Sequence, residues 1–162
     1  MKSLLIVRHA KSSWDSPSQK DFDRPLNERG HRDAPAMAKR LLNNKIVIDA
    51  FISSPAKRAF TTCKYFAEAY GVKEKEIIVI PRLYEASVLD FYNAVAGADN
   101  SFDCIALFSH NPGITAFANL LTATQIDNMP TCGVFAVKAE TNKWNDFEAS
   151  EKTFWFFDYP KH

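Results

Sequence analysis

The sequence has few cysteines, almost no net charge and no long hydrophobic run. Its three cysteines, Cys63, Cys104 and Cys132, lie far apart and include no C-x-x-C pair. We therefore interpret them as reduced, buried thiols rather than as a metal site or a disulfide framework. The formal net charge of +1 provides no global field that would recruit nucleic acid or an anionic membrane. Any positive potential must therefore be local.

The hydrophobic runs are too short to cross a bilayer. After Met1 and Lys2, the first apolar run spans only four residues before Arg8, which is too short for the core of a signal peptide. We therefore expect a cytoplasmic protein with neither a membrane nor a nucleic acid as its partner. With 162 residues, of which 46% are hydrophobic, the chain is expected to fold as a single domain over residues 1–162.

Short apolar runs alternate with helical patterns, which indicates βαβ units and an α/β fold with a largely parallel sheet. The end of the chain differs, because two β-branched and aromatic runs follow each other there without a helical pattern between them. These two runs predict a terminal antiparallel pair. The expected strands are Leu4–Val7, Ala50–Ile52, Ile77–Ile80, Ile105–Phe108, Val134–Ala139 and Thr153–Asp158.

The first two helices have recognisable ends. The first is expected to start after Asn27, a suitable N-cap residue, although Pro35 within its pattern predicts a kink or a delayed start. The second is expected to begin at Pro55, since proline is tolerated at the first helical position. Ser54 would cap this helix and Gly71 would end it.

Two further helices are expected in the second half of the chain. One covers about Val88–Ala96, and the other starts near Pro112, capped by Asn111, and runs to about Leu121. The aromatic run Phe154–Phe157 is interpreted as a core strand rather than as a platform for stacking nucleic-acid bases.

Basic side chains follow three of the expected strands. Arg8 and His9 follow the first, Arg58 lies just beyond the second, and His110 follows Ile105–Phe108. Each alone has a simpler explanation, such as a solvated arginine or a hydrogen-bonded histidine. Ligands of open α/β sheets bind at the carboxyl ends of the strands, and helix N-termini favour anions. Together the four residues therefore predict a phosphate site.

Four short motifs occur in order along the chain: Arg8-His9-Ala10, Pro25–Gly30, Ser53-Ser54-Pro55 followed by Arg58, and Ser109-His110-Asn111-Pro112. Together they resemble the histidine phosphatase (phosphoglycerate mutase-like) superfamily. This resemblance covers nearly the whole chain and implies a three-layer α/β/α sandwich with a mixed, mostly parallel central sheet. The short chain, the Arg-His-Ala variant and the segment Leu83–Ser87 are most similar to the SixA-type phosphohistidine phosphatase branch.

The resemblance implies a phosphatase that needs no metal ion or cofactor. His9 would attack phosphorus and become transiently phosphorylated, while a backbone carbonyl holds its other ring nitrogen. Arg8 and Arg58 would clamp the phosphoryl oxygens. His110, expected to be cationic beside a phosphate, and Asn111 would complete the phosphate-binding set.

Two positions depart from the family pattern, and one role stays open. Ala10 replaces the usual glycine, so the backbone there must avoid a positive φ. Asp15 stands where sugar-phosphate members tend to carry asparagine, and its negative charge argues against a phosphoglycerate mutase. Glu85 matches the spacing of the acid that protonates the leaving group in many members. The alternative is an exposed acid with no catalytic role.

Three functions remain open at this stage. The first is a phosphatase acting on phosphohistidine in a protein, for example a histidine phosphotransfer domain. The second is a phosphatase of the same mechanism acting on a small phosphate ester, such as a sugar phosphate or a nucleotide. The third is a non-catalytic sensor of phosphate or of a phosphoprotein. Substrate choice depends on loop shape, which the sequence does not determine.

Overall fold

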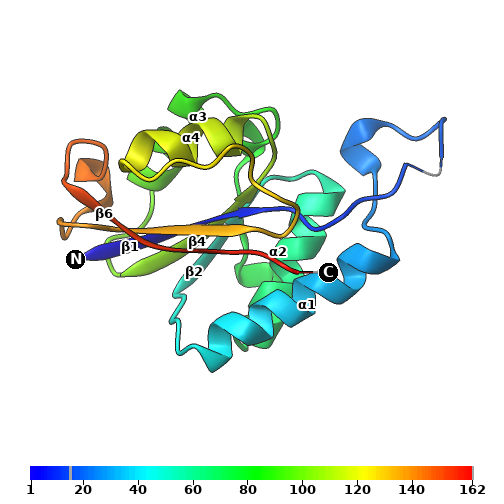
Figure 1. The fold of residues 1–162 in the computed structure, drawn as a ribbon, viewed down its shortest axis with the longest axis horizontal. Helices are drawn as coiled ribbons and strands as arrows, with labels where there is room; N and C mark the ends of the chain where they lie inside the picture. The colour runs from blue at the N-terminus through cyan, green and yellow to red at the C-terminus, as the bar shows by residue number, and fades with distance from the viewer. Residues whose placement is uncertain (15, 162) are drawn as a thin grey trace.

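The computed structural model describes residues 1–14 and 16–161, in which a six-stranded sheet is covered by helices on both faces (Figure 1). Asp15, one of the two departures from the family pattern, lies outside the described residues. The strand order is β3-β2-β4-β1-β5-β6. The strands are β1 (Lys2–Arg8), β2 (Ala50–Ser53), β3 (Ile78–Val79), β4 (Cys104–Ser109), β5 (Val134–Ala139) and β6 (Lys152–Asp158).

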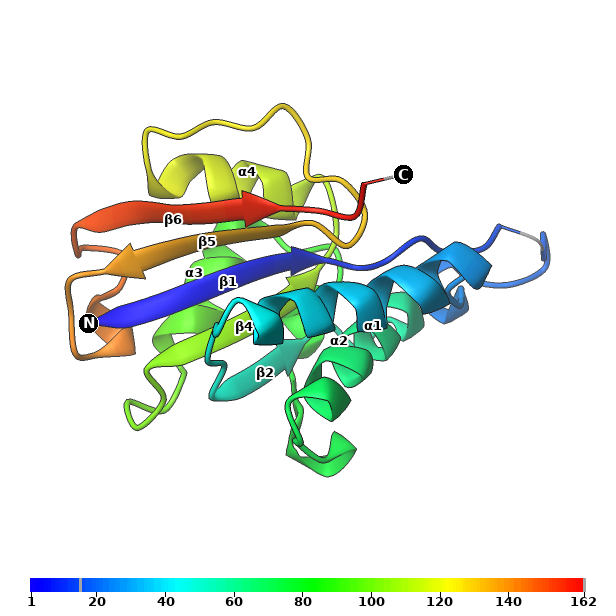
Figure 2. The same ribbon diagram turned by 60° about the horizontal axis from the view of Figure 1, so that its bottom comes forward.

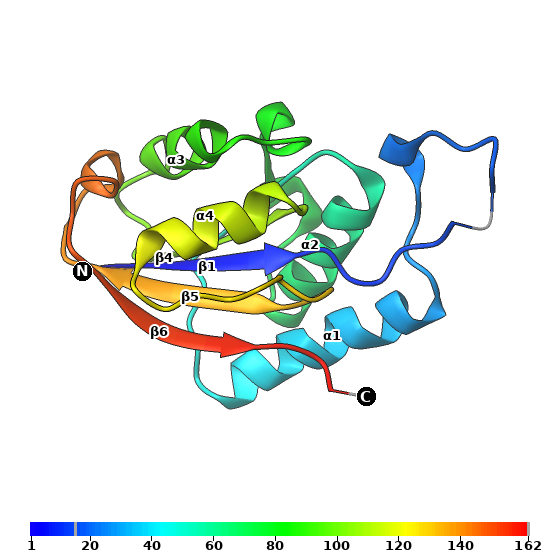
Figure 3. The same cartoon turned by 45° about the horizontal axis from the view of Figure 1, so that its top comes forward.

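The sheet is mixed. β1, β2, β3 and β4 pair in parallel, whereas β5 and β6 add the antiparallel pair at the end. Helices α1 (Glu28–Asn43) and α2 (Lys57–Ala69) lie on one face. Helices α3 (Val88–Ala96) and α4 (Gly113–Leu121) cover the other face (Figures 1 and 3). The expected three-layer α/β/α sandwich is therefore confirmed.

The central strands are buried on both faces, as is usual for a parallel sheet between two helical layers. Side chains of β1 alternate between two apolar clusters: Leu4 and Ile6 pack under α3 and α4, and Leu5 and Val7 pack against α1 and α2. Among the described helices, none has the length and apolar character needed to traverse a bilayer.

The first helix starts after Asn27, as expected, whereas the second starts later than expected. Asn27 caps α1, because its side chain accepts a hydrogen bond from the Gly30 N–H at 2.9 Å. This cap sets the start at Glu28, so the delayed start expected from Pro35 is wrong. Helix α2 begins at Lys57 rather than at Pro55. The Ser54 hydroxyl does not cap the helix: its oxygen accepts from the Ala56 N–H, ahead of the first helical residue, and lies 2.8 Å from His110 Nε2.

Other expectations need smaller corrections. Helix α4 begins at Gly113, and Asn111 is not its cap, because its Oδ1 accepts from the Thr115 hydroxyl instead of from a backbone N–H of the first turn. The aromatic run Phe154–Phe157 lies in the edge strand β6 of the expected terminal pair, where its side chains are half-buried and pack against both apolar clusters. The third strand keeps only the two residues that pair with β2.

The carboxyl ends of β1, β2 and β4 lie together at one edge of the sheet. The register pairs Arg8 with Ser109, and Ser53 with Phe108. The loop between β1 and α1 projects beyond this edge (Figure 2). The residues that follow the three strands are therefore adjacent in space, and the β1–α1 loop lies beside them.

One close contact holds the start of this loop against α1. A Cβ atom at Gly30 would collide with the carbonyl oxygen of Lys11, which also accepts a hydrogen bond from the Asn27 N–H. We expect Gly30→Ala to lower the free energy of unfolding by about 1–3 kcal/mol, the usual cost of overpacking. Urea unfolding measures this loss. Gly97→Ala is the control, since its Cβ would meet no atom closer than 3.5 Å; equal stability losses in both variants would contradict the assignment.

Candidate active site

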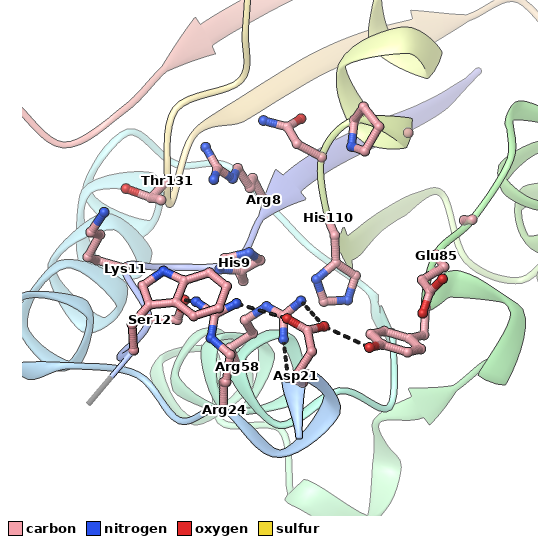
Figure 4. A pocket seen from close by; sticks show the side chains of 16 residues that line it. Arg8, His9, Lys11, Ser12, Asp21, Arg24, Arg58, Glu85, His110 and Thr131 are labelled. Atoms are coloured by element: carbon pink, nitrogen blue, oxygen red, sulfur yellow. Dashed lines mark hydrogen bonds and ion pairs between the residues drawn. The ribbon is translucent and has the colours of Figure 1, made fainter. Parts of the chain in front are cut away.

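A cavity of about 530 Å³ opens at the carboxyl edge of the sheet (Figure 4). It brings together all the residues that the sequence predicts for the site, including Glu85 and Asn111, with side chains from the β1–α1 loop and from the segment before α3. The lining residues are Arg8, His9, Lys11, Ser12, Trp14, Asp21, Arg24, Arg58, Tyr84, Glu85, Ala86, His110, Asn111, Pro112, Gly113 and Thr131.

His9 has one ring nitrogen held by the backbone. Its Nδ1 lies 2.7 Å from the carbonyl oxygen of Ala10, so Nδ1 carries the proton and donates it. The expectation of a backbone carbonyl at this nitrogen is confirmed. Burial lowers the pKa of His9 to about 3, and the positive charges of the nearby arginines act in the same direction. At neutral pH the ring is therefore uncharged, with the lone pair on Nε2.

His110 stands beside His9, with their ring centroids 5.3 Å apart. Its Nε2 lies 2.8 Å from the hydroxyl oxygen of Ser54. Burial, followed by the charge of Arg58, lowers the pKa of His110 to about 3. The protein surroundings thus oppose the cationic state expected for this residue. When the Ser54 hydroxyl donates to Nε2, a neutral His110 carries its proton on Nδ1.

The two arginines are both held at their outer nitrogens. Arg8 donates from Nη1 to the carbonyl oxygen of Met129 at 2.9 Å. Arg58 donates from Nη1 to the backbone oxygen of Asp21 at 2.7 Å and from Nη2 to its carboxylate at 3.0 Å. Burial and the charge of Arg58 lower the pKa of Arg8, but an arginine remains charged at neutral pH.

Three buried nitrogen atoms of this site have no hydrogen-bond partner among residues 1–14 and 16–161: Arg8 Nε, Arg58 Nε and His110 Nδ1. All three belong to the residues predicted to bind phosphate. A buried donor without a partner is destabilising by about 1–3 kcal/mol. Donors retained at this cost in one pocket have the chemistry to bind an anion with several oxygen acceptors.

Sequence reasoning missed three residues that line the cavity: Asp21, Arg24 and Tyr84. The Asp21 carboxylate accepts hydrogen bonds from Arg24 Nη1 at 2.9 Å and from the Tyr84 hydroxyl at 2.7 Å, in addition to Arg58. Partial burial acts in the opposite direction, but these donors hold the pKa of Asp21 well below its usual range. Partial burial and the hydrogen bond to Asp21 raise the pKa of Tyr84 to about 12.

Glu85 is exposed at the edge of the cavity, on the side of His110 (Figure 4). Its backbone has a φ of 55°, in the left-handed region that is unfavourable for residues other than glycine. Strain of this kind costs on the order of 1–3 kcal/mol and is concentrated at functional sites. Both alternatives for Glu85 remain compatible with its exposure, but its strained backbone favours a functional role.

The remaining predictions concern Asn111 and Ala10. The side chain of Asn111 is occupied, because its Nδ2 lies 3.0 Å from both Asn128 Oδ1 and the Met129 carbonyl. Phosphate binding by this residue would therefore rely on its backbone. Ala10 does not adopt a positive φ, as its replacement of glycine requires; its N–H donates to the Thr62 hydroxyl at 2.9 Å.

Comparison with known proteins agrees with this geometry. Residues 4–98 match the model of the histidine phosphatase superfamily (branch 1). An uncharacterized chloroplastic protein of Arabidopsis thaliana is 29% identical over 153 residues, covering 90% of this chain and 70% of the relative. Phosphoserine phosphatase 1 of Hydrogenobacter thermophilus is 36% identical over 85 residues, covering 49% of this chain and 39% of the enzyme. The chain thus matches less than half of that enzyme.

Solved structures share the fold over nearly the whole chain. A candidate phosphohistidine phosphatase SixA from Agrobacterium tumefaciens superposes with a TM-score of 0.83 at 24% identity, covering 99% of both chains. The protein histidine phosphatase SixA complexed with tungstate superposes with a TM-score of 0.82 at 21% identity, covering 97% of this chain and 96% of the other. At these identities the likeness demonstrates the fold.

The buried histidines make stability depend on pH. A histidine has a pKa near 6.5 in the unfolded chain, against about 3 for His9 and His110 in the fold. Their contribution is fully present above pH 6.5 and is lost as the pH falls towards 3, because the unfolded state binds more protons. From pH 7 to pH 5, we expect a loss of about 1–2 kcal/mol in the free energy of unfolding for each histidine.

Urea unfolding of the wild type, His9→Asn and His110→Asn at pH 7 and pH 5 measures this loss. Each variant should lose less stability than the wild type across this interval, whatever its stability at pH 7. Parallel pH profiles for all three proteins would contradict the assignment.

Proposed function

The chain belongs to the histidine phosphatase superfamily, and as a phosphatase of this family we propose that it removes the phosphoryl group from phosphohistidine in a protein, through a phosphorylated His9. The observation that carries the proposal is the protonation state of His9. Its Nδ1–H is fixed by the Ala10 carbonyl at 2.7 Å, and its uncharged Nε2 lies in a pocket lined by buried, unpartnered donors.

In the first step, the lone pair of Nε2 forms a bond to phosphorus while the bond from phosphorus to the leaving atom breaks. The leaving group takes the bonding electrons; an imidazole can leave already protonated, and an alkoxide receives a proton from an acid, for which Glu85 is the candidate. In the second step, water attacks phosphorus and gives a proton to the carboxylate of that acid or to solvent, the Nε2–P bond breaks, and inorganic phosphate leaves with His9 restored. The Ala10 carbonyl stabilises the positive charge that develops on the ring during the first step.

The remaining pocket donors stabilise the phosphoryl oxygens. The Nε atoms of Arg8 and Arg58 and the Nδ1 of His110 are buried without a partner among the described residues, in side chains that line the cavity, and we assign them to these oxygens. Fixed donors stabilise the developing charge without having to reorganise during the reaction. With Ser54 donating to Nε2, His110 can contribute its Nδ1 proton while it remains neutral.

The open mouth of the cavity supports a protein-borne substrate. Lys11, Trp14 and Glu85 line the cavity and are exposed, so a phosphorylated side chain on another protein can reach it. The shared fold of the two SixA structures adds support from analogy.

A small phosphate ester is the second candidate, favoured by the phosphoserine phosphatase relative. The same four residues would act on it. The difference lies in the leaving group, because an alkoxide is harder to expel than an imidazole, which can leave already protonated. A small ester therefore depends more strongly on an acid such as Glu85.

Turnover without added metal tests the proposal. We expect the wild type to hydrolyse a phosphorylated histidine phosphotransfer domain faster than a panel of sugar phosphates and phosphoserine. His9→Ala should abolish turnover, and Arg58→Lys should reduce it about 10²–10³-fold, because lysine keeps the charge but cannot reproduce the planar guanidinium donors, including Nε–H. Reactions with radiolabelled substrate are quenched in acid and, in parallel, in base, which distinguishes acid-stable from base-stable adducts. A base-stable label on the wild-type protein should be absent from His9→Ala.

The outcomes separate the three functions. If the enzyme prefers a small phosphate ester, its proposed substrate is a metabolite and not a phosphorylated protein. Binding of phosphate without turnover of any substrate would leave a sensor and would exclude the proposed activity.

Glu85 is tested by its dependence on the leaving group. If it is the acid, Glu85→Gln should lower kcat about 10²-fold or more on an alkyl phosphate, but less than about tenfold on phosphohistidine or an aryl phosphate, whose leaving groups need less protonation. The kcat values of both proteins on the three substrates give the comparison. A uniform effect on all substrates would leave Glu85 as an exposed side chain without an acid role.

A further inference from the structure

Asp21 is an anion placed against a residue that would bind an anion. It lies in the short 3-10 helix Asp21–Asp23 of the β1–α1 loop, and its side chain is 47% exposed. Its partner Arg58 is buried, with only 8% of the side chain exposed. An aspartate in this place invites two explanations: it competes with phosphate for Arg58, or it orients Arg58 for phosphate.

The hydrogen bonds show which part of Arg58 is occupied. Nη1 donates to the backbone oxygen of Asp21 at 2.7 Å, and Nη2 donates to its carboxylate at 3.0 Å. Asp21 therefore holds the outer edge of the guanidinium, formed by the two terminal nitrogens. Figure 4 shows Asp21 meeting Arg58 below the two histidines.

A guanidinium group has five N–H donors in one plane and can bind along more than one edge. Asp21 uses two of these donors. The inner edge, which contains Nε–H, keeps its donor buried and unpartnered among the described residues. Arg58 can thus bind a phosphoryl oxygen through Nε while it remains bound to Asp21.

We propose that Asp21 is a positioning residue for phosphoryl transfer, which holds the outer edge of Arg58 so that the Nε edge faces the phosphoryl group on His9. This inference rests on the proposed phosphatase function. Asp21 does not touch the substrate in this role. It acts through the orientation of Arg58.

Further contacts favour positioning over competition. The Asp21 carboxylate also accepts from Arg24 Nη1 and from the Tyr84 hydroxyl, and its backbone oxygen accepts from the Arg24 N–H. If Asp21 released Arg58, two hydrogen bonds would break, one to the main chain and one to the side chain of Asp21. An aspartate anchored in this way is a fixed support rather than a displaceable competitor.

Kinetics of Asp21→Asn and Asp21→Ala test the proposal. Because small displacements of a positioning group reduce the rate steeply, we expect kcat on an aryl phosphate to fall about 10–100-fold in both variants, with a smaller change in KM. Asp23→Asn is the matched control, since it removes an exposed carboxylate from the same short helix, and should stay within twofold of the wild type. Tyr84→Phe, which removes one hydrogen bond to Asp21 but keeps the Asp21–Arg58 pair, should lower kcat less than Asp21→Asn does.

A double-mutant cycle with Arg58→Lys separates positioning from a general loss of structure. Lysine has no Nε edge to orient, so Asp21→Ala should have little further effect in the Arg58→Lys background. Losses that multiply in the double variant would overturn the proposal. So would a kcat within twofold of the wild type, or an increase of kcat/KM in Asp21→Ala, which competition predicts.

An NMR measurement keeps the inference separate from the proposed activity. The Arg58 Nε–H resonance, assigned by its absence in Arg58→Lys, should be sharp and should shift when inorganic phosphate is added. In Asp21→Ala it should broaden and lose this response. The inference survives an inactive wild type if these signals behave as stated, and it is overturned if the resonance and its response are unchanged in Asp21→Ala.

Discussion

The parallel pairing of β1 with β4 and of β4 with β2 is the constraint on which the site depends. It pairs Arg8 with Ser109 and Ser53 with Phe108, so residues from three distant parts of the chain leave the sheet at one edge. A shift of one residue in this register would turn the alternating apolar side chains of β1 away from their clusters. Because both faces of β1 and β4 are buried, core packing enforces the register, and the register in turn places the candidate site residues.

His9, Arg8 and His110 are each held at one polar atom and keep another without a partner or with a free lone pair. The Ala10 carbonyl holds His9, the Met129 carbonyl holds Arg8, and Ser54 contacts His110. The buried nitrogens left without partners lower stability, because each unpaired donor costs about 1–3 kcal/mol. A pocket built in this way has its donors in place before the substrate arrives, which is the arrangement that stabilises a developing charge most strongly.

Site residues that lie next to a strand in the sequence could be predicted, and those within an irregular loop could not. Arg8, His9 and His110 directly follow apolar strands, so the periodic pattern alone brought them together. Asp21 lies within a loop that has no periodic pattern, and its contact with Arg58 spans 37 residues, so no local signal pointed to it. The predicted start of α2 was wrong for a related reason. Ser54 has the residue type of a cap, but its hydroxyl contacts a histidine 56 residues away.

The burial that keeps the His9 ring uncharged, as the proposed nucleophile requires, also limits the conditions in which the fold persists. Because burial lowers the pKa of His9 to about 3, its Nε2 keeps a free lone pair well into the acidic range. The unfolded chain, in contrast, takes up a proton at this histidine near pH 6.5. Stability therefore declines before the nucleophile titrates. Loss of activity in acid should follow from unfolding of the sheet edge that holds His9, and not from protonation of its lone pair.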